Sequence, residues 1–365
     1  MIKGRCIGAM ATALAVGLIG ALFSVVTAAP VLGPSHMMSE SQRALRSIKH
    51  CSRTSCRASG LEYVFVANQT QFNPFLGSVN YYPEGANGNV PPTGEIVGSK
   101  TQLTQVGGVV VDQNGVIYVA NNDTNTIVGF PPYSDGNVAP SIVIGGANTG
   151  LASPFGLAID GAGNLYVANC AVNCYPGPQP SVEEFAAGSN GNVWPLRVIT
   201  GSRTQLGETE GIAVDKRGYI YVSNADEGKV TVFRPRARGN AGLIRTITGG
   251  ASRIDQPDGI AVDDRSLYVA NWGDGLITRF NKEAGGDVPP EAVLHIGWQP
   301  NPSNPQALGG LAIDPGGSIY AAGTNVPLIA EYAARAHGKQ VPFSVISGSN
   351  TAFFYPSQVF VGLQP

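Results

Sequence analysis

Two acidic residues occupy equivalent positions in neighbouring segments of the chain, each directly before the same five-residue motif. Glu210 precedes one copy of Gly-Ile-Ala-Val-Asp, and Asp258 precedes the next. Carboxylate oxygens are hard ligands of the kind that suit Ca²⁺. Two carboxylates held close together also repel each other, and a bound cation would relieve that repulsion. The pair is therefore a candidate metal site, provided that the fold sets the two residues side by side.

A second candidate site consists of amide and aromatic side chains. In five of the six predicted repeats, one strand ends in an asparagine: Asn68, Asn121, Asn169, Asn224 and Asn271. An asparagine at such a position usually hydrogen-bonds the turn that follows. The functional alternative is a ring of donors and acceptors for a polar ligand, with Phe155, Tyr175 and Trp272 as stacking surfaces. Our candidate binding residues are Asn121, Asn169, Asn224, Asn271, Phe155 and Trp272.

Nucleophilic catalysis has little support in the sequence. The four histidines are His36, His50, His295 and His337. The first two precede the repeats, and the other two fall on an expected outer strand and an expected turn. A nucleophilic serine needs a base such as histidine within reach. We therefore assign no catalytic residue, and the sequence favours a binding protein over an enzyme.

These residues lie in a pattern that recurs along the chain. Each copy has a small or apolar stretch ending in Asp, a tight turn, and an apolar strand, as in GLAIDGAGNLYVAN and GIAVDKRGYIYVSN. The aspartates at positions 112, 160, 215, 263 and 314 are 48, 55, 48 and 51 residues apart. A period near 50 is typical of propeller blades and not of helical solenoids.

Each repeat is expected to contain four strands. The two halves of the motif are short runs rich in Val, Ile and Tyr, bounded by turn residues. The Asp between them should accept backbone N–H groups in the turn. A third strand ends in an aromatic residue, a Gly-Asn turn follows in most copies, and a fourth strand closes the unit. Four strands make one blade.

The two ends of the repeat region are complementary. The first unit begins with the strand Glu62–Ala67 and has no strand before it, whereas Tyr355 to Gly362 form a lone first strand. Pairing these strands would remove two exposed sheet edges. The predicted fold is therefore an all-β, six-bladed β-propeller of four-stranded blades, in which the C-terminal strand completes the first blade.

The repeats resemble NHL repeats, whose pattern is Gly-Ile-Ala-Val-Asp, a turn, Ile-Tyr-Val-Ala-Asp/Asn and a strand ending in Phe. The resemblance covers residues 61–362, and the last unit departs from it at Ala322-Gly323. In a propeller, the residue before the first-strand glycine faces the mouth of the central channel. Those positions hold Gly107, Phe155, Glu210, Asp258, Gly309 and Ser357.

Calcium-dependent lactonases of the gluconolactonase type are similar to NHL propellers and place acidic and amide ligands at such positions. The resemblance thus implies Glu210 and Asp258 as metal ligands, calcium as the cofactor, and a metal-dependent hydrolase or lactonase as the alternative function. The remaining mouth positions offer fewer anionic ligands than a tight site needs.

The N-terminal residues have the three-part pattern of a secretory signal. Lys3 and Arg5 precede an apolar run, and small residues follow at Ala28 and Ala29. An uncleaved membrane anchor is the competing interpretation, because the run approaches the length that spans a bilayer. The predicted organisation is a signal peptide at 1–29, a polar basic linker at 30–60 and the propeller at 61–365. The mature protein is expected to be secreted, periplasmic or extracellular, with no stable membrane insertion.

Four cysteines lie beyond the signal: Cys51, Cys56, Cys170 and Cys174. In an oxidising compartment they favour two local disulfides, although other connectivities and a zinc site stay open.

The net charge is −2, without the basic patch of nucleic-acid binders, so we expect no nucleic-acid partner. The predicted function is an exported binding module whose channel face receives a polar small molecule, a glycan or a peptide.

Overall fold

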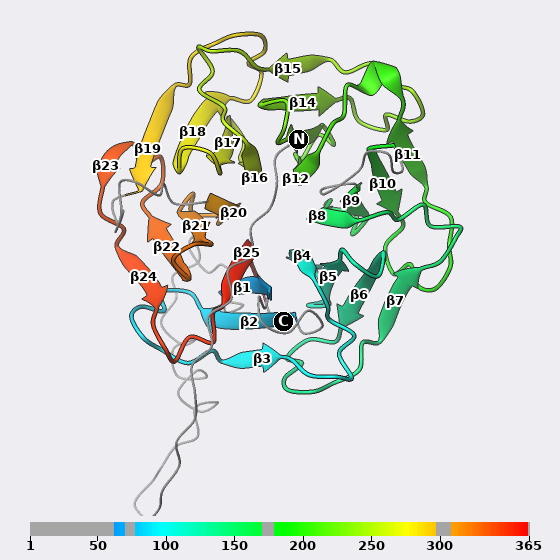
Figure 1. Cartoon of the computed structure of the whole chain (residues 1–365), viewed down its shortest axis with the longest axis vertical. Coiled ribbons are helices and arrows are strands. Elements are labelled where there is room, and N and C mark those ends of the chain that lie inside the picture. The colour runs from blue at the N-terminus through cyan, green and yellow to red at the C-terminus, as the bar shows by residue number, and fades with distance from the viewer. Residues whose placement is uncertain (1–61, 70–76, 170–178, 297–307, 364–365) are drawn as a thin grey trace, which may run out of the picture. The chain divides into compact units, whose positions relative to one another are not determined.

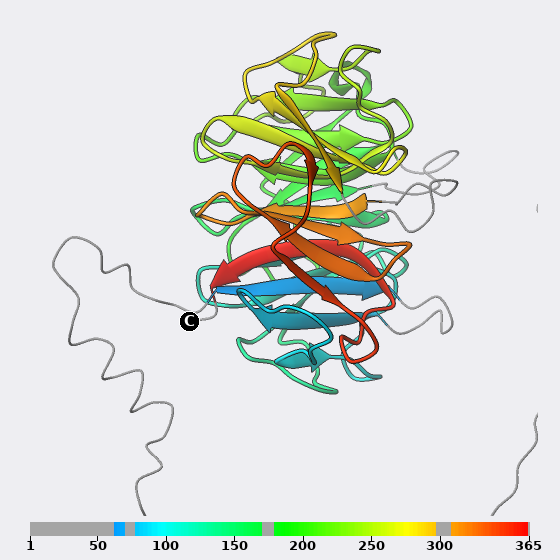
Figure 2. The ribbon, with the colours of Figure 1, turned by 90° about the vertical axis from the view of Figure 1, so that its left-hand side faces the viewer.

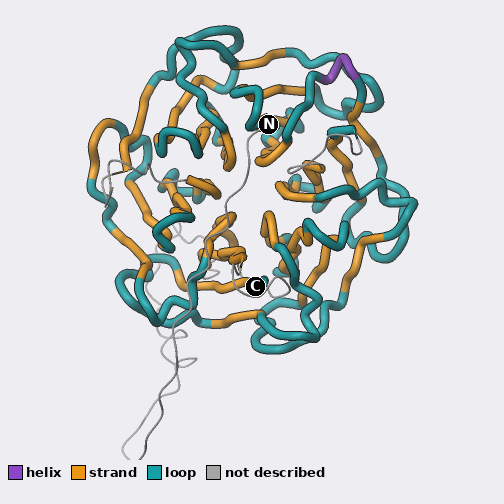
Figure 3. The backbone as a smooth tube through the Cα atoms, in the orientation of Figure 1, coloured by secondary structure: helices purple, strands orange, loops and turns teal. Residues whose placement is uncertain are grey.

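The computed structural model describes residues 62–69, 77–169, 179–296 and 308–363, all within the compact unit Ser59–Pro365. The strands of this unit form six sheets arranged as blades around a central axis (Figure 1). Strands and turns make up almost all of the described chain, and a short 3₁₀-helix at Ser202–Thr204 is its helical element (Figure 3). The predicted all-β, six-bladed propeller is confirmed. Within the described ranges, no helix has the length and apolar character to cross a membrane.

Each blade extends from an innermost strand beside the central axis to an outermost strand at the rim. In that order, blade 1 contains β25 (Tyr355–Leu363), β1 (Glu62–Gln69), β2 (Ser78–Pro83) and β3 (Gly94–Ile96). Blade 2 contains β4 (Val106–Val111), β5 (Ile117–Asn121), β6 (Thr126–Phe130) and β7 (Ile142–Gly145). Blade 3 contains β8 (Pro154–Ile159), β9 (Leu165–Asn169), β10 (Ser181–Phe185) and β11 (Arg197–Thr200).

The other three blades follow the same order of strands. Blade 4 contains β12 (Thr209–Val214), β13 (Ile220–Asn224), β14 (Lys229–Phe233) and β15 (Arg245–Ile247). Blade 5 contains β16 (Pro257–Val262), β17 (Ser266–Asn271), β18 (Leu276–Asn281) and β19 (Ala292–Ile296), joined at its edge by β23 (Gly338–Gln340). Blade 6 contains β20 (Leu308–Ile313), β21 (Ile319–Gly323), β22 (Leu328–Tyr332) and β24 (Ser344–Ser347).

The ring closes in blade 1, where the two ends of the propeller meet. The C-terminal strand β25 pairs antiparallel with β1, with Val64 opposite Val361 and Phe65 opposite Phe360. Figure 2 shows the two strands, red and blue, side by side. The predicted pairing is therefore confirmed, and both strands gain a neighbour that neither would have if the ring were open.

A second set of contacts links the blades at the rim. The outermost strand of each blade bridges in parallel to the turn before the outermost strand of the next, as Ile96 does with Gly136. The asparagine of that Gly-Asn turn adds a side-chain contact, because Asn137 Oδ1 accepts the backbone N–H of Lys100 at 2.7 Å. The Gly-Asn turns thus clamp neighbouring blades together, a role that the sequence pattern alone does not reveal.

The hydrophobic core of the described chain lies between the blades and not within any one of them. It consists of six clusters, each built from two neighbouring blades. The aromatic residues that end the third strands are almost completely buried in these clusters: Phe130, Phe185, Phe233, Phe280 and Tyr332. Strands covered on both faces need apolar residues on both, so their sequences do not alternate strictly.

The aspartate of each repeat has the structural role predicted for it. Asp160 Oδ1 accepts the backbone N–H groups of Ala162 and Asn164, each at 2.9 Å, and Gly163 adopts a φ of +83°. The predicted signal peptide at 1–29, the linker at 30–60, all four cysteines beyond the signal and Tyr175 lie outside the described residues.

Candidate binding site at the channel mouth

The residues predicted to face the channel mouth lie on β-bulges. In β12, Thr209 pairs with Asn224 and Ile212 pairs with Val222, so Glu210 and Gly211 together oppose one residue of β13. The same irregularity places Asp258 and Gly259 on a bulge in β16. Bulges locally re-aim side chains and are frequent beside functional sites. They are the local reason that the innermost strands present side chains at the mouth.

The glycines of these bulges let neighbouring innermost strands approach closely. A Cβ on Gly259 would lie 2.6 Å from the carbonyl oxygen of Gly309 in the next blade, a separation that real Cβ atoms essentially never show. A Cβ on Gly211 would likewise overlap the carbonyl oxygen of Asp258. The strands carrying Glu210 and Asp258 therefore lie directly side by side, as the metal-site hypothesis required.

Ser223 joins these two strands by hydrogen bonds. Its Oγ accepts the N–H of Gly211 at 2.7 Å and donates to the carbonyl oxygen of Asp258 at 2.7 Å. Ser223 stands in the Tyr-Val-Ser-Asn copy of the motif, where the other copies have alanine. That departure is a signal from which this positioning residue could have been found.

A cavity of about 300 Å³ opens at this mouth and receives side chains from all six blades. Its lining contains Gln69, Gln105, Asn122, Phe155, Glu208, Glu210, Ala225, Asp226, Gln256, Asp258, Trp272, Thr324, Tyr355 and Ser357. Of the predicted mouth residues, the structure brings together Phe155, Glu210, Asp258 and Ser357, whereas Gly107 and Gly309 do not line the cavity. The predicted binding residue Trp272 also lines it.

The lining residues that sequence reasoning missed follow a simple rule. Gln105, Glu208, Gln256 and Tyr355 each stand two residues before a predicted mouth residue. Side chains at i and i+2 share one face of a strand, so the alternation could have identified Tyr355 of β25. Gln105, Glu208 and Gln256 lie just before β4, β12 and β16, where this alternation does not apply. Asn122, also missed, directly follows an asparagine of the predicted ring, as the predicted residue Trp272 does.

The asparagines of that ring stand behind the cavity wall. Asn121, Asn169, Asn224 and Asn271 have no exposed surface, and none belongs to the described lining. Their Oδ1 atoms accept backbone N–H groups of the segment that leads into the innermost strand: those of Thr104, Ala152, Gly207 and Asp255. Each amide therefore anchors the segment that carries the lining residues, in addition to contacting the strand that follows.

Burial and mutual repulsion perturb the carboxyl groups of the cavity. Burial, followed by repulsion from Asp258, Glu208 and Asp226, raises the pKa of Glu210 well above its usual range. Burial raises the pKa of Asp258 to about 7, although Gln358 Nε2 donates a hydrogen bond to its Oδ1 at 3.1 Å and opposes the rise. Burial and then a hydrogen bond with Asp226 raise the pKa of Glu208 to about 7. The cluster therefore holds protons near neutral pH.

These shifts predict how stability depends on pH. A carboxyl group whose pKa is raised by folding binds protons more tightly in the folded state, so stability falls as pH rises from the unfolded pKa through the folded one. We expect the melting temperature of the parent protein to fall between about pH 5 and pH 8. In the Glu210→Gln, Asp258→Asn double variant the melting temperature should fall less over this range, so that the variant melts higher than the parent at about pH 8. Glu208 and buried Glu183, whose pKa values are raised to about 7 and about 8, are unchanged in this variant and keep their parts of the slope.

The control for this melting experiment is Asp264→Asn. The Asp264 side chain is 72% exposed and pairs with Lys216, which lowers its pKa, so this variant should leave the slope intact. An unchanged slope in the double variant would contradict the assignment of buried, protonated carboxyls to the cavity.

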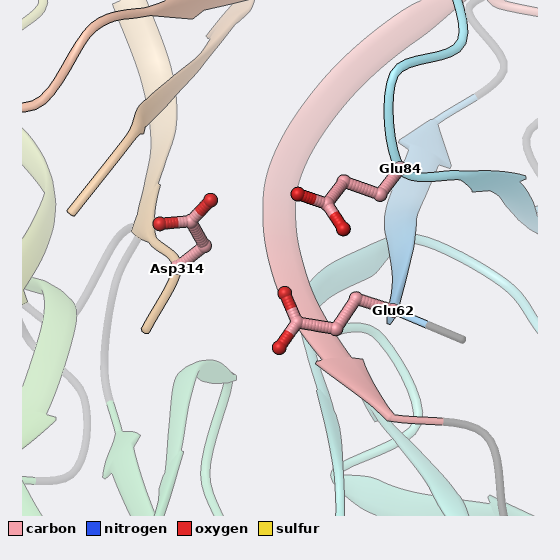
Figure 4. A group of neighbouring side chains, drawn as sticks. All are labelled: Glu62, Glu84 and Asp314. Carbon is pink, nitrogen blue, oxygen red and sulfur yellow. The ribbon is translucent and has the colours of Figure 1, made fainter. Parts of the chain in front are cut away.

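A different acidic group lies at the far end of the innermost strands. One carboxylate oxygen each from Glu62, Glu84 and Asp314 lies within 4.8 Å of the others (Figure 4). In the part of the chain that the structure describes, this is the one group of three or more potential metal ligands so close together, and Glu210 and Asp258 do not belong to it. Closure of the ring brings blade 6 next to blade 1, so spacing along the chain could not have revealed the group.

Comparison with known proteins supports the fold and goes no further. No family model matches the chain, and no curated protein matches its sequence. A protein of unknown function from Bacteroides caccae superposes with a TM-score of 0.58 at 13% identity, over 84% of this chain and 100% of that one. The periplasmic gluconolactonase PpgL of Pseudomonas aeruginosa superposes with a TM-score of 0.53 at 16% identity, over 80% of this chain and 84% of that one. A chain of a nidogen–laminin complex superposes with a TM-score of 0.54 at 13% identity, over 83% of this chain and 99% of that one. The chain is thus a six-bladed propeller that shares its fold with a gluconolactonase and with proteins of other kinds.

Proposed function

We propose that the chain is an exported NHL-type propeller that acts as a binding module, with the cavity at the channel mouth as its ligand site. The observation that carries the proposal is the convergence of carboxylate, amide, hydroxyl and aromatic side chains from six blades on one concavity of about 300 Å³. Small-molecule sites are typically concave and combine apolar walls with a few convergent polar groups. Their volumes begin at roughly this size, so a compact ligand or the end of a larger one would fit.

The chemistry of the lining supports binding over nucleophilic catalysis. The described lining includes no histidine, lysine, arginine or cysteine. Its serine, Ser357, directs its Oγ towards the carbonyl oxygens of Ala67, Val106 and Gly107 at 3.1 to 3.3 Å. A hydroxyl engaged with carbonyls and lacking a neighbouring base is a poor nucleophile.

The lining also suits the ligand classes expected from the sequence. Trp272 and Tyr355 place their ring centroids 6.4 Å apart with a 47° tilt, and amide groups at Gln69, Gln105 and Gln256 offer both donors and acceptors. Such a combination is suited to a polar small molecule, a glycan or the terminal residues of a peptide.

A screen with a blocked cavity tests the proposal. Compounds that bind the folded protein raise its melting temperature, so ligands of the cavity should stabilise the parent protein. The variant Ala225→Trp, which fills the cavity from its wall, should lose the effect. The matched control Ala187→Trp places the same ring on an exposed turn and should respond as the parent does. Stabilisation by every hit in both variants alike would contradict a ligand site in the cavity.

The second candidate is a calcium-dependent hydrolase or lactonase, favoured by the adjacent positions of Glu210 and Asp258 and by the fold shared with a gluconolactonase. Calcium takes six to eight oxygen ligands, and the described mouth offers no three clustered carboxylates. If this candidate is correct, we expect the protein to hydrolyse gluconolactone. We also expect calcium to raise the melting temperature of the parent protein but not that of the Glu210→Gln, Asp258→Asn variant. A calcium-dependent rise in melting temperature that persists in this double variant but disappears in Glu84→Gln would place the ion at the group of Glu62, Glu84 and Asp314.

A further inference from the structure

We propose that the ligand of the channel-mouth cavity is an organic cation, whose ammonium group lies against the carboxylates of Glu210 and Asp258 and whose body packs on Phe155, Trp272 and Tyr355. The inference rests on the proposed function, because it takes the cavity as the ligand site and names the class of ligand.

The charge of the cavity is one-sided. Four carboxyl-bearing residues line it, Glu208, Glu210, Asp226 and Asp258, and no basic side chain does so among the residues described. They come from the neighbouring blades 4 and 5, so negative charge gathers on one side of the mouth. Such a wall repels anionic ligands and attracts cations, and the attraction is strengthened where protein excludes water.

Three buried carboxylates elsewhere in the propeller, those of Glu183, Asp215 and Glu331, have donors for both oxygens. Glu331 accepts from Tyr320 and Ser344, one at each oxygen. Asp215 likewise accepts backbone N–H groups at Oδ1 and the Lys282 ammonium at Oδ2. In these places the fold itself provides the partners that buried polar groups require.

The two central carboxylates of the cavity lack such a full set of donors among the described residues. Asp258 is only 8% exposed, yet its one side-chain donor is Gln358 at Oδ1, and no described residue donates to its Oδ2. Glu210 accepts no hydrogen bond from the described residues, and what surrounds it is the negative charge of Asp258, Glu208 and Asp226. A ligand carrying N–H donors and a positive charge would supply the hydrogen bonds and the counter-charge that the described residues do not provide here.

Aromatic rings surround the same cavity from three directions. Phe155 comes from blade 3, Trp272 from blade 5 and Tyr355 from blade 1, so the rings are contributed by alternate blades. Faces of Trp, Tyr and Phe attract ammonium groups electrostatically, and aromatic cages are a recurrent way of binding quaternary ammonium ligands. A neutral sugar would use the stacking surface but would leave the carboxylates of Glu210 and Asp258 without a counter-charge.

Calorimetry with matched probes tests the inference. 2-Phenylethylamine and 2-phenylethanol share the same heavy-atom frame and differ in charge. At about pH 8, above the pKa of about 7 of Glu208 and Asp258, we expect the amine to bind at least about tenfold more tightly than the alcohol. Asp258→Asn and Glu210→Gln should each weaken amine binding about tenfold, and Trp272→Leu about threefold or more. Glu291→Gln, which removes an exposed charge at the outer edge of blade 5, should leave it unchanged.

Each other outcome has a definite consequence. Equal binding of alcohol and amine, with no effect of Asp258→Asn, would overturn the cation inference while leaving the cavity as a ligand site. Failure of the amine to bind with a Kd below about 10 mM would overturn it as well. Calcium binding that depends on Glu210 and Asp258, without amine binding, would favour the metal-dependent candidate instead. Failure of the proposed function has a separate signature, namely that no hit in the blocked-cavity screen distinguishes Ala225→Trp from the parent.

Discussion

A chain ended at Phe354 is expected to lose the cooperative folding of the propeller. The truncation removes β25, which is the innermost strand of blade 1 and pairs with β1 along its whole length. It also removes Val359 and Val361 from the core between blades 6 and 1, and Phe360 from the packing between blades 1 and 2. Each buried apolar side chain of this size contributes about 1.5–3 kcal/mol, against a net stability that is typically about 5–15 kcal/mol. Loss of the strand should therefore consume most of the stability of the ring.

Thermal unfolding followed by circular dichroism measures this effect. The truncated chain should unfold over a broad range without a defined transition, and a synthetic peptide of residues 355–363 added in trans should restore the transition. Leu363→Ser is the control, because this residue is 51% exposed and loss of its side chain should cost little. A truncated chain that melts cooperatively near the temperature of the parent would refute the view that closure by β25 holds the ring together.

The substitution Gly259→Ala is expected to destabilise the protein by about 3 kcal/mol, at the upper end of the usual cost of overpacking. The added methyl group would meet the carbonyl oxygen of Gly309 and the backbone nitrogen of Leu311, both at 2.6 Å. Both atoms belong to the backbone of the next blade, so no side chain can rotate away to make room. The two innermost strands would have to separate, and the bulge that presents Asp258 to the cavity would move with them.

The matched control is Gly250→Ala in the segment that leads into the same blade. A Cβ there meets nothing within 4 Å, and the backbone lies outside the left-handed region, so the variant should be as stable as the parent. Urea unfolding compares the two variants through their midpoints. The Gly259→Ala protein should also bind cavity ligands more weakly, which Gly250→Ala should not. Equal midpoints for the two variants would mean that the innermost strands are not packed as tightly as the structure places them.

Much of the fold could be predicted because its signals are local. The aspartate turns, the Gly-Asn dipeptides and the runs of Val, Ile and Tyr each act over a few residues, and their repetition near every 50 residues sets the blade. The unpaired strands at Glu62–Ala67 and Tyr355–Gly362 sufficed to predict closure, because a missing strand at one end matched a surplus strand at the other.

The site could be predicted only in part. Phe155, Glu210, Asp258 and Trp272 line the cavity as expected, because the blade pattern alone determines which residue precedes the first-strand glycine and which follows the strand-ending asparagine. The asparagines themselves proved to be fully buried. A propensity for turns and caps does not tell which neighbouring segment an amide will hold.

What the sequence by itself determined is the repeat, the order of strands within each blade and the strand that closes the ring. The tertiary structure decided the bulges, the hydrogen bonds of Ser223 to the strands of Glu210 and Asp258, and the hydrogen bond from Gln358 to Asp258. It also decided that Glu62, Glu84 and Asp314 lie close together. The physical reason is that strand identity depends on neighbours along the chain, whereas the ionisation and hydrogen bonding of a side chain depend on whatever lies around it in space. At the channel mouth six blades converge, so residues 100 positions apart, such as Asp258 and Gln358, determine each other's environment.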